Sequence, residues 1–81
     1  MMNNNNINKR TAMQSKLDTI MGLRPYTDGY TLPWNEIDVN GNTKWFMRKK
    51  YTTEIISFDD LPIPTRNALF IFIANNQDYF N

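Results

Sequence analysis

The apolar positions of this chain are most concentrated near its C-terminal end, where Ala68–Ala74 is an uninterrupted run of seven hydrophobic residues. A transmembrane helix needs about 20 such residues, so this run belongs to a core or an interface. Its aromatic and β-branched residues also fit a strand. However, Pro62 and Pro64 suit the first turn of a helix. The carboxylates of Asp59 and Asp60, just upstream, favour a helix N-terminus. We therefore predict a helix, with a strand as the alternative.

On a helical wheel, the side chains of this run do not separate into one apolar face and one polar face. Four of them share an arc of about 140°, namely Ala68, Leu69, Phe72 and Ile73. Phe70, Ile71 and Ala74 lie outside that arc, where a surface helix is normally polar. A chain of 81 residues has little material with which to cover a helix on all sides. This surplus apolar surface is covered either by the rest of the domain or by a partner.

A second helical pattern lies near the N-terminus and extends from Asn8 to Gly22. Its apolar residues recur at helical spacing, at Met13, Leu17, Ile20 and Met21. Gly22 is a residue type that ends helices, and Pro25 lies just beyond it. The Asn-rich start of the chain, residues 3–6, is expected to be flexible. The pattern therefore predicts an N-terminal helix preceded by a flexible segment.

Between the two helices, Trp34–Met47 has the composition and alternation of a β-hairpin. Asp38–Gly41 suits a type I turn with Asp first and Gly last, closed by a bulge. The cross-strand pairs in that register are Glu36 with Lys44 and Trp34 with Phe46. Opposite charges and aromatic rings then face each other, which stabilises a sheet. We therefore predict a hairpin in this register.

Two further segments complete the predicted α+β fold. Leu23–Pro33 is expected to form an ordered loop with a turn at Thr27–Gly29. Tyr51–Phe58 has strand composition and either extends the hairpin or forms a third strand. The order is thus an N-terminal helix, a central β-hairpin with a third strand as an option, and a C-terminal helix. We predict a flexible Asn-rich N-terminus at residues 1–7 and a single small α+β domain at residues 8–81.

Composition narrows the class of protein. A hydrophobic content of 41%, with 14% aromatic residues, is enough for one modest core and is untypical of a disordered chain. Cysteine is absent, so disulfides do not stabilise the fold. No apolar segment follows Met1, which argues against a signal peptide. We expect a cytoplasmic protein with no membrane span.

The net charge of +1 is too small to indicate nucleic-acid binding by itself. The charges are nevertheless distributed unevenly. Residues 1–50 contain eight Lys and Arg against four Asp and Glu, whereas residues 51–81 contain one against four. This asymmetry is compatible with orienting a partner or a second copy, but it is also common in proteins where it has no role.

Catalytic and metal-binding chemistry has little support in the sequence. Histidine and cysteine are both absent, which removes the commonest acid–base catalyst and the usual zinc ligands. Asp38–Asn42 resembles the start of a calcium loop, but Thr43 and Lys49 occupy the positions where that loop requires Gly and Glu. The pair Asp59-Asp60 is explained by a helix entry without hydrolysis. We predict no catalytic residue, no metal and no cofactor.

A basic and aromatic segment follows the hairpin turn. Its relevant residues are Trp45, Arg48, Lys49 and Lys50. Rings that stack on bases, next to cations that pair with phosphates, are typical of surfaces that bind single-stranded nucleic acid. An ordinary hairpin with inward rings and solvated lysines has the same composition. A nucleic-acid-binding role for these four residues is therefore the alternative hypothesis.

Three stretches of the chain carry a resemblance to a known family, namely Met13–Tyr26, Lys44–Pro62 and Asn67–Phe80. With the chain length and the Asn-rich start, they resemble the small accessory proteins of T4-like bacteriophages, in particular the cytoplasmic lysis-inhibition proteins, or antiholins. The resemblance implies a non-enzymatic protein of the host bacterial cytoplasm. It further implies binding to the cytoplasmic part of the phage holin, which delays lysis. It assigns no role to any individual residue.

The preferred hypothesis is a regulatory protein that acts by protein–protein contact. The residues expected to form the contact surface are Phe70, Ile71 and Ala74, extended by Tyr79 and Phe80. The partner is another protein, with a phage holin implied by the resemblance, or a second copy of this chain. The alternative is a small phage protein that binds nucleic acid or inhibits host defence through the basic and aromatic hairpin.

Overall fold

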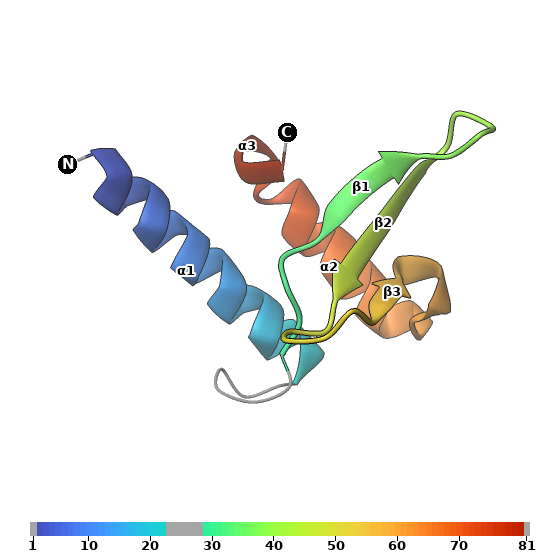
Figure 1. Ribbon diagram of the computed structural model, residues 1–81, viewed down its shortest axis with the longest axis horizontal. Helices are drawn as coiled ribbons and strands as arrows, with labels where there is room; N and C mark the ends of the chain where they lie inside the picture. The colour runs from blue at the N-terminus through green and yellow to red at the C-terminus, as the bar shows by residue number, and fades with distance from the viewer. Residues whose placement is uncertain (1, 23–28, 81) are drawn as a thin grey trace.

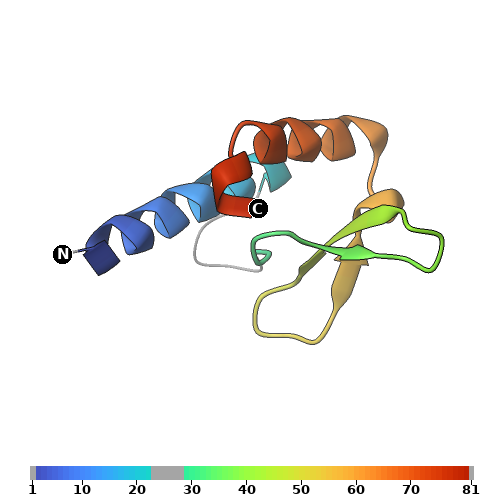
Figure 2. The same cartoon turned by 90° about the horizontal axis from the view of Figure 1, so that it is seen from above.

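The computed structural model describes residues 2–22 and 29–80, with side chains from Lys9 onward. The elements, in chain order, are α1 (Met2–Met21), β1 (Trp34–Ile37), β2 (Thr43–Arg48), β3 (Ile55–Ser57), the 3₁₀ helix η1 (Phe58–Asp60), α2 (Ile63–Ala74) and α3 (Gln77–Phe80). The three strands form one antiparallel sheet in the order β1-β2-β3. The helices lie on one side of this sheet (Figures 1 and 2). The α+β fold is as the sequence predicts.

The core lies where α1, α2 and the sheet meet. Its buried hydrophobic residues are Met13, Leu17, Met47, Phe58, Leu69, Phe72 and Ile73. They come from α1, β2, η1 and α2, so no element forms the core alone. The N-terminal half of α1 extends beyond this region, and the hairpin tip extends at the opposite end of the molecule (Figure 1).

Helix α1 begins at Met2, earlier than the predicted start at Asn8. Its apolar stripe faces the core as predicted, because Met13 and Leu17 are buried, and the side chains that follow pack against the same cluster. The helix ends at Met21, and Gly22 follows in the left-handed conformation with a φ of 68°. The amide of Gly22 donates to the carbonyl of Thr19 at 3.1 Å, which closes the last turn.

The predicted loop at residues 23–33 is described only from Gly29 onward, and the predicted turn at Thr27–Gly29 lies mostly outside the described residues. Gly29 is buried, and its carbonyl accepts from the amide of Lys50 at 2.8 Å. Tyr30 forms an isolated antiparallel bridge with Lys49. The end of the loop is thus attached to the outgoing end of β2.

The hairpin has the predicted register. Its pairs are Trp34 with Phe46, Asn35 with Trp45, Glu36 with Lys44, and Ile37 with Thr43. In the turn, the amide of Gly41 donates to the carbonyl of Asp38 at 3.0 Å, and Gly41 has a φ of 84°. This is the expected type I turn followed by a left-handed glycine.

The third strand is much shorter than Tyr51–Phe58. Tyr51 has a φ of 63°, and the amide of Thr52 donates to the carbonyl of Lys49 at 3.2 Å, so the chain turns there. Only Ile55–Ser57 pairs with β2. The option of a third strand is therefore confirmed, but the strand is limited to Ile55–Ser57 because a turn occupies the first half of the predicted segment.

Helix α2 resolves the ambiguity of the apolar run in favour of a helix, with Pro62 as its N-cap and Pro64 in the first turn. The carboxylates of Asp59 and Asp60 lie just upstream of α2, as the sequence predicts. They belong to η1, where the hydroxyl of Ser57 accepts from the amide of Asp59.

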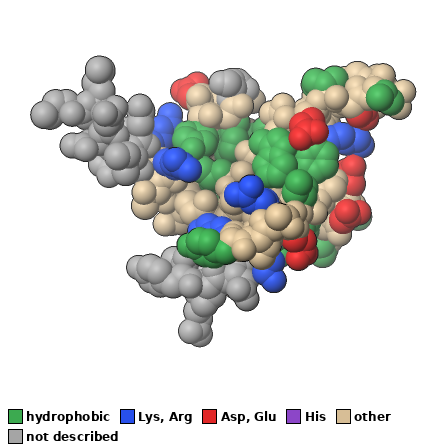
Figure 3. Space-filling view, in the orientation of Figure 1, with side chains coloured by type: hydrophobic (Ala, Val, Ile, Leu, Met, Phe, Trp, Pro, Cys, Tyr) green, Lys and Arg blue, Asp and Glu red, His purple; other side chains and the backbone are tan. Residues whose placement is uncertain are grey.

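Charged and apolar side chains are mixed on the face of the molecule shown in Figure 3. Hydrophobic side chains gather in its middle, and Lys and Arg side chains lie beside them. Most of the carboxylates on this face lie toward the hairpin and the β3–η1 corner. The Lys44 ammonium and the Asp59 carboxylate form an ion pair there at 3.1 Å.

Candidate interaction surface

The outer side of α2 carries an apolar surface formed by Phe70, Ile71 and Ala74. Ile71 is 62% exposed and Phe70 is 41% exposed, and Ala74 is exposed as well. These are the three residues that the helical wheel places outside the buried arc. The structure leaves them at the surface, and their role in binding stays a prediction.

Phe70 belongs partly to the core. Its ring centroid lies 5.5 Å from that of Phe58, in an edge-to-face arrangement. Phe58 is almost completely buried. A substitution of Phe70 therefore changes the packing of the fold as well as the surface. Ile71 is the better probe of binding, because most of its side chain is free of such contacts.

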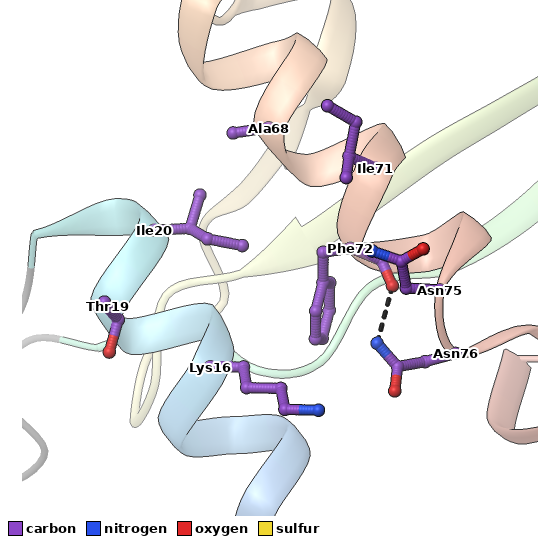
Figure 4. Close-up of a pocket in the computed structure, with 8 residues that line it drawn as sticks. All are labelled: Lys16, Thr19, Ile20, Ala68, Ile71, Phe72, Asn75 and Asn76. Carbon is purple, nitrogen blue, oxygen red and sulfur yellow. Dashed lines mark hydrogen bonds between the residues drawn. The ribbon is translucent and has the colours of Figure 1, made fainter.

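Ile71 also borders a groove of about 510 Å³ between α1 and α2. The residues that line this α1–α2 groove are Lys16, Thr19, Ile20, Ala68, Ile71, Phe72, Asn75 and Asn76. Figure 4 shows Ile20 and the ring of Phe72 in the space between the two helices. The apolar side chains form its floor, so the groove can accept an apolar segment more readily than a charged one.

Polar groups border the α1–α2 groove at one end. The ammonium of Lys16 points toward Asn76, at the C-terminal end of α2 (Figure 4). The amide nitrogen of Asn76 donates to the carbonyl of Phe72 at 2.7 Å, which satisfies a carbonyl of the last helical turn. Lys16 is exposed and supplies a positive charge at this rim.

Tyr79 and Phe80 lie in the short helix α3 and are half-buried. The ring of Phe80 packs edge-on against Trp45 and Phe72, with centroid distances of 5.9 and 5.6 Å. Tyr79 in turn packs against Phe80. These rings extend the core toward the C-terminus, whereas the sequence places them on the contact surface.

The structure does not bring the four residues of the basic and aromatic segment onto one surface. Trp45 is half-buried, and its ring stacks on that of Phe58 at 6.3 Å. Arg48 is exposed and, three positions further along β2, lies on the opposite face of the strand. Lys49 and Lys50 follow the strand and are half-buried. Their binding to nucleic acid stays a prediction.

Sequence reasoning missed the groove residues on the α1 side, Lys16 and Thr19, and it assigned Ile20 to the core. The apolar stripe of α1 does include Ile20, so the signal for a buried position was present. The sequence carries no signal that α2 lies opposite α1, because all three strands lie between the two helices along the chain. Only their packing creates the groove.

Within residues 2–22 and 29–80, no three acidic side chains come together as ligands for a metal ion. Among the described helices, none is both long and apolar enough to cross a bilayer. Comparison of the chain with protein-family models, curated proteins and solved structures finds no match.

Proposed function

We propose that this chain is a non-enzymatic regulatory protein that binds a protein partner at the α1–α2 groove and the adjoining apolar surface of α2. The observation that carries the proposal is the exposure of Ile71 at the rim of an apolar groove. A helix whose apolar side chains face water on this scale is stabilised when a partner covers them. Grooves between helices accept the apolar side of a partner helix.

The partner that we propose is the cytoplasmic part of a phage holin, bound in the host bacterial cytoplasm so that lysis is delayed. This choice rests on the resemblance of Met13–Tyr26, Lys44–Pro62 and Asn67–Phe80 to the antiholins of T4-like phages. Two of these stretches contain the groove residues of α1 and α2. The positive charge of Lys16 at the rim favours a segment that carries a carboxylate near its apolar residues.

The test compares two variants of α2 that introduce the same charge. Ile71→Asp places a carboxylate at the groove, and Ile63→Asp places one at the first residue of the same helix. Ile63 is 65% exposed and Ile71 is 62% exposed, so the two changes are matched in chemistry and in burial. Ile63 does not line the groove.

We expect Ile71→Asp to weaken binding to the purified cytoplasmic segment of the holin by about tenfold or more, as loss of a central apolar contact does. Ile63→Asp should bind like the unmodified chain, and both variants should melt close to it. Isothermal titration calorimetry measures the affinity, and circular dichroism measures the melting temperature. Equal binding by the two variants, or no binding by the unmodified chain, would refute the proposal.

A second copy of this chain is the alternative occupant of the groove. Analytical ultracentrifugation of the unmodified chain and of Ile71→Asp distinguishes self-association from binding to a holin segment. A dimer that Ile71→Asp dissociates, together with no binding to the holin segment, would assign the groove to a second copy of this chain.

A further inference from the structure

A second pocket, on a different part of the molecule from the α1–α2 groove, combines cations with aromatic rings. Its volume is about 430 Å³, within the range of about 300–1,000 Å³ typical of small-ligand sites. The residues of interest among those that line it are Arg10, Gln14, Trp34, Arg48, Lys50 and Tyr79. They come from α1, β1, α3, and the end of β2 with the turn after it, so the pocket exists only in the folded chain.

The charge of this basic pocket is strongly one-sided. Arg10, Arg48 and Lys50 contribute three positive charges, and none of the described residues that line the pocket is acidic. Asp18 lies behind it, only 3% exposed, and accepts a hydrogen bond from the amide nitrogen of Gln14 at 3.1 Å. Glu36 also lies beside the pocket, where its carboxylate accepts from the indole nitrogen of Trp34. If Asp18 and Glu36 each offset one charge, the pocket still has a surplus of about one positive charge, which favours an anion.

Gln14 is held in place by two hydrogen bonds. Its amide nitrogen donates to Asp18 and also to the carbonyl of Tyr30 at 2.6 Å. Both hydrogens of this amide nitrogen are therefore engaged, and the side chain of Gln14 is fixed in the wall of the pocket.

Two aromatic side chains complete the pocket. Trp34 is oriented by a hydrogen bond from its indole nitrogen to Glu36 at 2.9 Å and by packing against Phe46 at 5.9 Å. Tyr79 is oriented by its edge contact with Phe80 at 5.3 Å. Rings fixed in this way offer stacking surface to a planar group, with little loss of conformational entropy when it binds.

We propose that the basic pocket binds a nucleoside 5′-phosphate, with the phosphate held by Arg48, Arg10 and Lys50 and the base placed against Trp34 and Tyr79. The guanidinium groups of arginine match phosphate oxygens in pairs, which a lone ammonium does not. The bound nucleoside 5′-phosphate is either a free mononucleotide or the 5′ end of a single strand. The site differs from the predicted nucleic-acid surface, because Trp34 takes the place of Trp45.

Arg48 is the most informative residue to change. Its backbone is fixed to Thr31 by two hydrogen bonds, since the amide of Thr31 donates to the carbonyl of Arg48 at 2.8 Å and the hydroxyl of Thr31 accepts from the amide of Arg48 at 3.1 Å. The side chain is exposed. Arg48→Gln therefore removes the guanidinium and leaves these backbone contacts in place.

The matched control is Lys49→Gln, which removes one positive charge from the next residue along the chain. Lys49 is not among the residues that line the basic pocket. The ligands to be titrated at low salt are AMP, UMP, adenosine, inorganic phosphate and a short oligouridylate with a 5′-phosphate. Isothermal titration calorimetry gives the affinity, and the NMR shift of the Trp34 indole N–H reports on contact with the base.

We expect saturable binding of AMP or UMP that Arg48→Gln weakens by about tenfold or more, as loss of a charge-assisted contact does. Lys49→Gln should change the affinity by less than about twofold, because surface charges outside the site act weakly. Adenosine and inorganic phosphate should each bind more weakly than AMP. Tighter binding of the oligouridylate than of UMP would identify a strand as the source.

Three results would overturn the proposal. These are no binding of any nucleotide at low salt, an equal loss of affinity in Arg48→Gln and Lys49→Gln, and inorganic phosphate binding as tightly as AMP. If Arg48→Gln does not fold, Arg10→Gln replaces it, because Arg10 is an exposed residue of α1. The same expected loss and the same control then apply.

Discussion

Asp38 fixes the hairpin turn through both its side chain and its backbone. One carboxylate oxygen accepts from the amides of Asn40 and Asn42, each at 2.9 Å. The hydrogen bond from the Asn42 amide is the main cause that lowers the pKa of Asp38 below its ordinary value. The turn is therefore stabilised by the ionised form of this residue.

This gives a prediction for the pH dependence of stability. Because the pKa of Asp38 is lower in the folded than in the unfolded chain, its contribution is fully present above the ordinary value of about 4. It is lost as the pH falls through the lowered folded value. Asp38→Ala should therefore lower the melting temperature at about pH 7 and much less at about pH 2. Asp60→Ala is the control. A fall in melting temperature for Asp38→Ala that is the same at both pH values would contradict the prediction.

Gly22 is the residue on which the end of α1 depends. Its φ of 68° lies in the left-handed region, and an added Cβ would meet no atom of the described residues within 4 Å. Gly22→Ala should therefore cost only the backbone strain, about 1–2 kcal/mol. Gly22→Asn should cost less, since Asn tolerates this conformation. Urea unfolding measures both variants, and equal losses would show that backbone strain is not the cause.

At the scale of elements, Arg66 connects α2 to η1. Its guanidinium donates to the carbonyls of Phe58, Asp59 and Leu61 at 3.0–3.1 Å. The cation therefore supplies donors to the carbonyls of Asp59 and Leu61 and a second donor to the carbonyl of Phe58, which also accepts from the amide of Leu61. Neither the hairpin pattern nor the helix pattern indicated this role.

Arg66→Lys tests the connection. The lysine keeps the charge, but its donors all lie on a single nitrogen, so it cannot reach three separate carbonyls. We expect the free energy of unfolding to fall by about 1–3 kcal/mol. Urea denaturation measures the loss, with Arg10→Lys, at an exposed position of α1, as a control of the same exchange. An unchanged stability of Arg66→Lys would show that charge alone is sufficient.

At the scale of the whole molecule, stability depends on the docking of α1. Leu17 is completely buried and, with Met13, contributes the α1 side of a core whose other residues come from α2, η1 and β2. Leu17→Ala should therefore cost about 2–5 kcal/mol. Val39→Ala, at the fully exposed hairpin tip, should change the stability by less than about 0.5 kcal/mol. Thermal melting measures both variants. Equal melting temperatures would show that the docking of α1 contributes little to stability.

Features that depend on neighbours along the chain were predictable from residue types and their spacing. The register of β1 and β2 followed from the pairing of Glu36 with Lys44 and from the turn residues Asp38 and Gly41. The stripe of Met13 and Leu17 gave the buried side of α1. These interactions span a few residues, so residue types and their spacing are enough to predict them.

Features that bring distant segments together arise only when the helices and the sheet pack. Ile20 and Ile71 line the same α1–α2 groove, and Arg10 and Arg48 line the same basic pocket. The same packing places Phe80 edge-on against Trp45, so that both rings are half-buried. Such contacts depend on how whole elements pack, and a linear pattern of apolar and charged residues does not specify which elements will face one another.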